Sequence, residues 1–168
     1  YSLAFTHSPN TTEVIAKLSK MMRYMLYDSN HPKVPLEKEI EYIENYISLE
    51  KLRLNHSIPI DFEVKGKTNQ VLIVPLVLIA FLENAFKHGV NGNDPNSWVK
   101  VLLYIDGKTC IYNVENSTFI STNGRIKESS GIGLQNLKRR LELSYPNGHE
   151  LKVEKKDNKH SIQLKIDL

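Results

Sequence analysis

The spacing of the apolar residues changes once along the chain, near residue 58, and this change limits the folds that are possible. Before it, apolar residues recur every three or four positions, which predicts one helix around Val14–Leu26 and a longer one around Leu36–Leu54. From Ile58 they alternate with polar residues, which predicts a strand, and Pro59 indicates an edge strand or a strand start. We therefore expect an α+β protein in which a helical segment precedes a mixed domain.

The segment over residues 28–35, rich in proline and asparagine, separates the two helices. So short a connection allows an antiparallel helix pair, or one helix that leads into a globular domain. The two helices could simply cover a core, or they could form a dimerisation stem that transmits a signal. The residue pattern leaves both interpretations open.

The elements after the first strand are predicted from apolar spacing and from turn residues. They are, in order, a helix whose first turn is set by Pro75 and which stops at Gly89, strands over 98–105 and 109–116 joined as a hairpin, a mobile polar loop over 118–130, a helix through Leu134, Leu137 and Leu141, and a final hairpin that turns at Asp157-Asn158.

Composition excludes several classes of protein. The 22 basic and 19 acidic side chains are interspersed, so no basic stripe for nucleic acid is present and we expect no nucleic-acid partner. The single cysteine, Cys110, is expected in the core and fits a reducing cytosol. The longest apolar run, Val71–Leu82, is well short of the roughly 20 residues of a spanning helix. Because the chain opens at Tyr1 without a methionine or signal segment, we interpret it as part of a longer protein.

Four polar residues lie close together near the end of the helix that stops at Gly89. Asn84, Lys87 and His88 share a helix face, and Glu83 lies one turn before Lys87. An amide oxygen can ligate Mg²⁺, a lysine and a histidine can contact phosphate or ribose, and a carboxylate can polarise a proton donor. The alternative is a solvated helix end whose cations favour the C-terminal dipole.

A second candidate feature is Gly131-Ile132-Gly133-Leu134, at the start of the next predicted helix. Two glycines one residue apart let the backbone approach a ligand, and a helix N-terminus attracts phosphate through its free N–H groups. The alternative is an ordinary turn into a helix. The feature gains weight from its place downstream of the Asn84 helix.

Together these segments resemble a known family. Glu83–Gly89 resembles the N box of the LytS-type sensor histidine kinases, and Gly131–Leu141 resembles their second glycine box with the helix behind it. The order and spacing of the two motifs agree with the family. The resemblance extends backwards, because residues 18–24 and 34–53 look like the linker helices of that family.

The resemblance implies a Bergerat-type ATP-binding α/β sandwich, a mixed sheet with helices on one face. Residues 1–55 would be the remnant of a dimerisation and linker segment, and 56–168 the ATPase catalytic domain. The implied site roles are Mg²⁺ ligation by Asn84, contacts to phosphate or ribose by Lys87 and His88, contacts to ATP by Gly131, Gly133 and Leu134, and a catalytic, orienting role for Glu83.

The function implied is that of a bacterial two-component protein-histidine kinase. Such an enzyme transfers the γ-phosphoryl of ATP to a histidine, from which a response regulator receives it in a phosphorelay. The resemblance further implies a homodimer in the full-length protein and a cytoplasmic domain whose parent is anchored in the inner membrane. Two alternatives are a degenerate nucleotide-binding scaffold without kinase activity, and another ATPase of the superfamily such as a chaperone or a topoisomerase.

The chain departs from the family pattern at the adenine site. The family carries an aspartate that accepts from the adenine amino group, whereas here the matching strand end reads Val114-Glu115-Asn116-Ser117. We align Asn116 with that aspartate because it keeps the strand alternation, and an amide can both accept and donate. Glu115 is the alternative reader of adenine.

The second departure concerns the phosphoacceptor histidine, which the family places just before a segment like Ser2–Phe5. His7 does not sit in that context, and no acceptor motif surrounds the four other histidines outside the binding helix: His31, His56, His149 and His160. The phosphoacceptor is therefore expected upstream of Tyr1. We expect this chain to bind ATP without phosphorylating itself.

Overall fold

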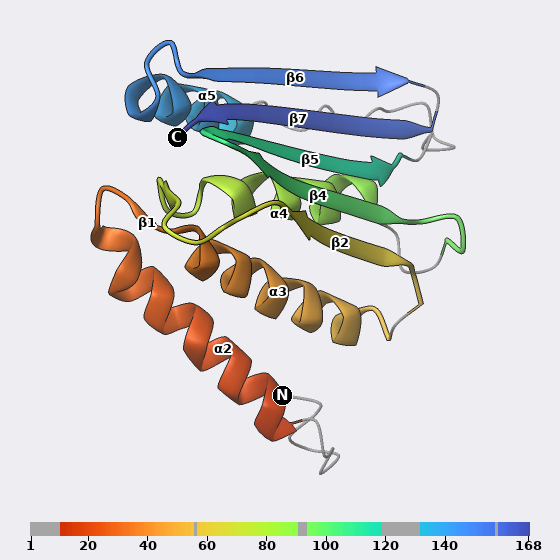
Figure 1. Ribbon diagram of the computed structural model, residues 1–168. Helices are drawn as coiled ribbons and strands as arrows, with labels where there is room; N and C mark the ends of the chain where they lie inside the picture. Colours follow the sequence, from red (N-terminus) through yellow and green to blue (C-terminus); the bar gives the residue numbers. More distant parts are fainter. Residues whose placement is uncertain (1–10, 56, 91–93, 119–131, 157) are drawn as a thin grey trace.

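The computed structural model describes residues 11–55, 57–90, 94–118, 132–156 and 158–168. Within these ranges a five-stranded mixed sheet is covered on one face by helices, with one further helix packed outside them (Figure 1). This confirms the expected α/β sandwich preceded by helices. The sheet supplies the frame on which the candidate site is built.

The sheet has the strand order β2-β4-β5-β7-β6. Its strands are β2 (Ile60–Lys65), β4 (Val99–Asp106), β5 (Thr109–Ser117), β6 (His149–Lys156) and β7 (Lys159–Asp167). Only β2 and β4 are parallel among these neighbours. Both predicted hairpins are confirmed, with β4 paired to β5 through Asp106↔Thr109 and β6 paired to β7 through Lys156↔Lys159. Strand β2 follows Pro59 and lies at an edge, as the sequence predicts.

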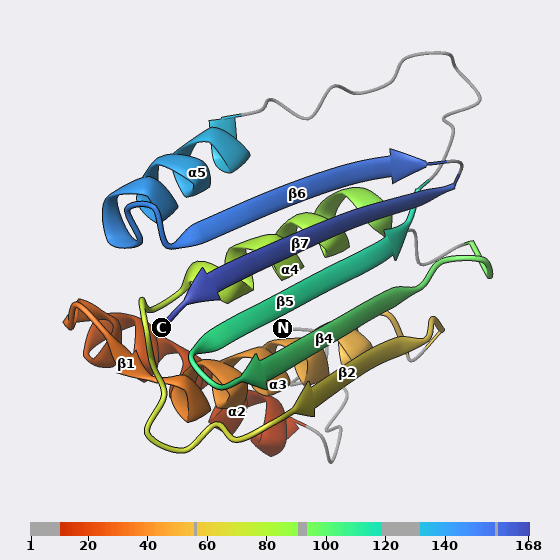
Figure 2. The same ribbon diagram turned by 45° about the horizontal axis from the view of Figure 1, so that its top comes forward.

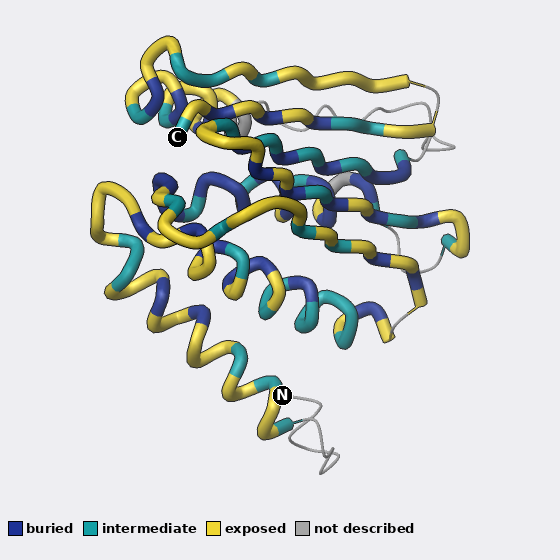
Figure 3. The backbone as a smooth tube through the Cα atoms, in the orientation of Figure 1, coloured by how far each residue is buried: buried dark blue, intermediate teal, exposed yellow. Residues whose placement is uncertain are grey.

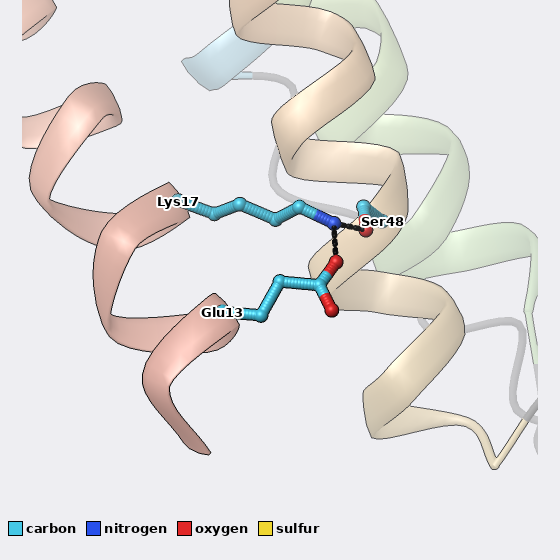
Figure 4. A network of polar contacts seen from close by, with 3 residues as sticks. All are labelled: Glu13, Lys17 and Ser48. Atoms are coloured by element: carbon cyan, nitrogen blue, oxygen red, sulfur yellow. Dashed lines mark hydrogen bonds and ion pairs between the residues drawn. The ribbon is translucent and has the colours of Figure 1, made fainter. Parts of the chain in front are cut away.

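Two of the helices precede the sheet in the chain. They are α2 (Thr11–Leu26) and α3 (Leu36–Arg53), joined through a short 3₁₀ turn, η1 (Asp28–Asn30). The two helices run antiparallel, because the earlier residue of α2 contacts the later residue of α3. The Lys17 ammonium contacts Ser48 (Figure 4), and the ring centroids of Tyr24 and Tyr42 lie 5.2 Å apart. α3 packs in turn on the domain, so both arrangements left open by the sequence occur together.

The other two helices lie over the sheet. They are α4 (Val77–Gly89), which contacts β4 and β5, and α5 (Ile132–Ser144), which runs antiparallel to α4 (Figure 2). The start of α4 differs from the prediction. Leu76, with a left-handed backbone (φ 57), is the residue before the helix, so Pro75 lies outside the first turn. A two-residue strand pair, β1 (Val34–Pro35) with β3 (Leu72–Ile73), brings the start of α3 beside this segment and was not predicted.

The core lies between the sheet and the helices. Alternate residues of β5 face it, and they include Cys110, Tyr112 and Val114, all buried. The burial map shows the same alternation along β4 and β7, whereas β6 and most of α2 are exposed (Figure 3). Cys110 is a core residue, as expected.

One hydrophobic core includes residues on both sides of the predicted domain boundary at residue 55. Leu36 and Ile43 of α3 belong to the same buried cluster as Leu164 of the sheet. The boundary itself stays a prediction. In the part of the chain that the structure describes, no helix is both long and apolar enough to cross a membrane.

Candidate functional site

The carboxyl end of α4 is fastened to the end of β5. A Cβ at Gly89 would lie 1.7 Å from Nδ2 and 2.8 Å from Cβ of Asn116, so only glycine allows this approach. The Ser117 hydroxyl donates to the Gly89 carbonyl (2.9 Å) and accepts from the Trp98 N–H (3.1 Å). Gly89 therefore serves here as more than a helix stop: it lets the helix carrying Asn84 reach the strand carrying Asn116.

Asn116 lies at the helix-facing side of β5 and is 2% exposed. Its Nδ2 donates to the Ser117 carbonyl (2.7 Å). Its Oδ1 is buried and has no hydrogen-bond partner among the described residues. A buried amide oxygen without a partner is costly, and a donor from a ligand would satisfy it.

Glu115, the other candidate reader of adenine, lies on the opposite face of the sheet. Its carboxylate pairs with the Lys159 ammonium at 2.5 Å and accepts weakly from the Ser161 hydroxyl at 3.4 Å. The alternation of β5 therefore separates the two candidates, with Asn116 on the helix side and Glu115 on the open side.

A pocket of about 680 Å³ opens at this end of the sheet. Trp98, Ser117, Thr118 and Asn158 contribute to its lining. The backbone N–H of Thr118 donates to the Asn158 carbonyl (2.7 Å), which ties the end of β5 to the turn between β6 and β7. The pocket is thus lined by Ser117, the residue that follows Asn116 in the chain.

The polar residues predicted on α4 lie on its later turns. Asn84 is half-buried, whereas Glu83 and Lys87 are exposed. The side chain of His88 is outside the described part of the structure. Although Glu83 is exposed, the residues around its carboxyl shield it in part from water and raise its pKa. Its charge in turn contributes to the raised pKa values of Tyr42 and Tyr46 on α3.

The glycine segment is described only in part. Gly133 and Leu134 belong to the first turn of α5, whereas Gly131 and most of the predicted 118–130 loop are outside the described residues. Arg140 and Tyr145, from the last turns of α5 and just beyond, contact the segment before α4. Because α5 is antiparallel to α4, its first turn lies on the side of the later residues of α4 (Figure 2).

Ser117 was missed by the sequence reasoning, although its hydroxyl joins the end of α4 to Trp98, the residue before β4. The available signal was a pair of small polar residues, Asn116-Ser117, at the end of a strand whose other inward residues are apolar. A buried polar pair at a strand end is expected to make specific hydrogen bonds.

The chain is similar to histidine kinases in three comparisons. The family model for histidine kinases matches residues 1–58. The sensor protein kinase HptS of Staphylococcus aureus is 34% identical over 85 residues, which are 50% of this chain and 16% of HptS. The chain thus matches only a small part of the length of that curated relative.

Solved structures share the fold. The nucleotide-free catalytic domain of the histidine kinase ThkA has a TM-score of 0.58 at 15% identity and covers 80% of this chain and 93% of its own. ThkA in complex with the response regulator TrrA has a TM-score of 0.55 at 17% identity, covering 93% of this chain and 48% of that one. The first third of this chain therefore matches the histidine kinase family. The chain as described shares the fold of a histidine kinase catalytic domain.

Proposed function

We propose that this chain is the ATP-binding catalytic region of a two-component sensor histidine kinase. In the full-length protein it would deliver the γ-phosphoryl of ATP to a histidine upstream of Tyr1, for relay to a response regulator. Phosphoryl transfer asks the protein mainly to position the groups and to neutralise charge. The residues proposed for these tasks come from α4, β5 and α5.

The buried amide oxygen of Asn116 is the observation that carries the proposal. It is an acceptor without a partner, on the helix side of β5, beside the end of the helix that carries Asn84. Because Nδ2 is already engaged by Ser117, the amide offers a ligand an acceptor, which suits the amino group of adenine. Glu115 faces away from the helices and is the weaker candidate.

The phosphate end of the site is proposed from α4 and α5. Asn84 would ligate Mg²⁺ through its amide oxygen, and Lys87 and His88 would contact phosphate or ribose. Gly131, Gly133 and Leu134 would contact ATP at the start of α5, where helix N–H groups favour an anion. Glu83 would orient the reacting groups. Bound Mg²⁺ would supply charge neutralisation at the phosphates.

The proposed partners are a second copy of the chain and a response regulator. The outward face of α2 carries apolar side chains that nothing in the described structure covers, including Ile15, Leu18 and Met22, and such a face supports a homodimer. The ThkA complex with TrrA is a precedent for the response regulator. A cytoplasmic location below an inner-membrane anchor belongs to the same proposal.

Calorimetry with Mg-ATP tests the nucleotide site. Asn116→Leu removes the acceptor and is expected to weaken ATP binding at least about tenfold. Asn113→Leu is the matched control, because Asn113 lies on the same strand and its side-chain oxygen is also buried and without a partner among the described residues. Asn113 shares its face of β5 with Ile111 and Glu115, so it lies on the open face of the sheet. Equal effects of the two substitutions would argue against the assignment. Absence of binding by the wild type would favour the degenerate scaffold.

The metal assignment has its own test. Asn84→Ala is expected to remove the Mg²⁺ dependence of ATP binding, since the amide is the proposed ligand from α4. Unchanged Mg²⁺ dependence would show that the ion is held elsewhere. Transfer itself is tested with labelled ATP: this chain should stay unlabelled, whereas a longer chain carrying the upstream histidine should become labelled.

A further inference from the structure

The three residues before α4 are held by groups from distant parts of the chain. The Val74 N–H donates to the Tyr145 hydroxyl (2.8 Å), the Pro75 carbonyl accepts from the Arg140 guanidinium (2.7 Å), and the Leu76 N–H donates to the Glu39 carboxylate (2.8 Å). Arg140 and Tyr145 come from α5 and its end, and Glu39 comes from α3. The start of α4 is therefore fixed by two other helices.

α4 needs this support because its own sequence provides no cap. The first N–H groups of a helix lack partners within it, and a side chain such as Ser or Asp usually satisfies one of them. Here the capping position is Leu76, in a left-handed conformation without a side-chain cap hydrogen bond. Glu39 supplies the missing acceptor from another helix, and a carboxylate is favoured by the positive end of the helix dipole.

Glu39 is 1% exposed, which is unusual for a carboxyl group. Burial raises its pKa, while the Tyr24 hydroxyl, the Leu76 and Leu78 backbone and the Arg140 charge act in the opposite direction. A buried carboxyl rarely adds stability compared with an apolar side chain. Its presence is better explained by the specific position that it imposes on α4.

The same carboxylate oxygen also contacts α2. The Tyr24 hydroxyl donates to Oε1 of Glu39, the oxygen that accepts from the Leu76 N–H. Tyr24 is buried, and its ring packs against Tyr42. One oxygen atom of Glu39 thus joins α2 to Leu76, the residue immediately before α4. α4 is the helix that carries Asn84 and Lys87.

We propose that Glu39 is a positioning residue of the nucleotide site. It acts through α4, whose start it holds, and Tyr24 makes the placement of α2 part of the same contact. Glu39 does not itself belong to the residues proposed to touch ATP. The inference rests on the proposed function, since α4 matters to binding only if it carries the nucleotide ligands.

Calorimetry of the whole chain with Mg-ATP provides the test. Glu39→Ala is expected to weaken ATP binding about tenfold, within the usual range for coupling between sites. Glu39→Gln is expected to restore binding to within about twofold, because its amide oxygen still accepts from the Leu76 N–H. Ile43→Val, one turn further along α3 at a fully buried position, is the control for lost packing. Wild-type affinity in Glu39→Ala, or an equal loss in Ile43→Val at an equal loss of Tm, would overturn the proposal.

A second pair of variants tests the link to α2. Tyr24→Phe removes only the hydroxyl that contacts Glu39 and is expected to weaken ATP binding about threefold. Tyr42→Phe removes the hydroxyl of the neighbouring ring and should leave affinity unchanged. Equal behaviour of the two would contradict the link. This pair keeps the proposal testable if Glu39→Ala does not fold.

Failure of the proposed function has a different signature, because the wild type itself would then bind no nucleotide. Exchange of the amide hydrogens of Leu76–Leu78 still reports on the anchor in that case. Faster exchange in Glu39→Ala than in Ile43→Val would show that Glu39 holds the start of α4. Equal exchange in the two variants would show that it does not.

Discussion

The helices α2 and α4 differ in how the rest of the chain uses their apolar residues. On α4, Leu78, Phe81 and Leu82 are completely buried between the sheet and the neighbouring helices. On α2, Ile15 is 58% and Met22 49% exposed. Both helices carry apolar residues at helical spacing, yet only α4 is enclosed by its own chain.

This difference separates two roles for an amphipathic helix. α4 is part of the core, so its position follows from packing and from the contacts at its two ends. α2 is attached on one side through Tyr24, Met21 and the Lys17 contact with Ser48, and its other side remains apolar. An exposed apolar stripe on a globular domain is typical of an interface.

The same substitution on the two helices gives the sharpest comparison. Leu82→Ala on α4 is expected to lower the free energy of unfolding by about 2–5 kcal/mol, because it leaves a cavity in a packed core. Leu18→Ala on α2 should change it by less than about 0.5 kcal/mol, because that side chain is half-exposed. Urea unfolding at low protein concentration measures both. Similar losses would mean that α2 is packed as tightly as α4.

The fastening of α4 to β5 can be tested at Gly89. Gly89→Ala is expected to cost about 1–3 kcal/mol, since the new methyl group would meet the buried Asn116 amide. It should weaken ATP binding as well, because it displaces the proposed adenine reader. Gly148→Ala is the control, with its nearest neighbour at 3.8 Å. If Gly89→Ala were as mild as Gly148→Ala in the same unfolding assay, the close approach would not exist in solution.

The contact that joins α2 to α4 predicts a smaller, pH-dependent effect. Burial raises the pKa of Glu39 above its ordinary value of 4.5, so the folded state holds this proton more tightly than the unfolded state. The effect of Glu39 on stability is therefore most favourable at low pH and becomes less favourable as the pH rises through the pKa of the folded state. In thermal unfolding, the stability of the wild type relative to that of Glu39→Gln should decrease from about pH 4 upward. A difference that is constant, or that grows in favour of the wild type, would contradict the raised pKa.

The smallest expected effect on folding comes from the exposed face of α2. Met22→Glu should change the free energy of unfolding of the monomer by less than about 0.5 kcal/mol, because the side chain is half in solvent. It should nevertheless weaken self-association, which sedimentation measures. Glu44→Gln, on the exposed side of α3, is a control for surface charge. Unchanged self-association in Met22→Glu would leave the proposed dimer without its surface.

Much of this architecture could be predicted from local sequence. Apolar spacing indicated the four helices α2, α3, α4 and α5, and alternation together with turn residues indicated both hairpins of the sheet. The alternation of β5 also placed Asn116 with the buried residues, apart from Glu115. These features depend on residues that are near one another in the chain, so a short window of sequence contains the information.

Features that depend on residues far apart in the chain became evident only from the tertiary structure. The start of α4 was misplaced from sequence because its acceptor is Glu39, on another helix, and no local capping residue reveals it. The need for glycine at position 89 comes from Asn116, on a strand that follows later in the chain. Periodicity tells which side of an element is apolar, but it does not tell which atoms meet there. Which atoms meet depends on how the elements pack together. Packing determines where a buried carboxyl, such as that of Glu39, is tolerated and where only glycine fits, as at position 89.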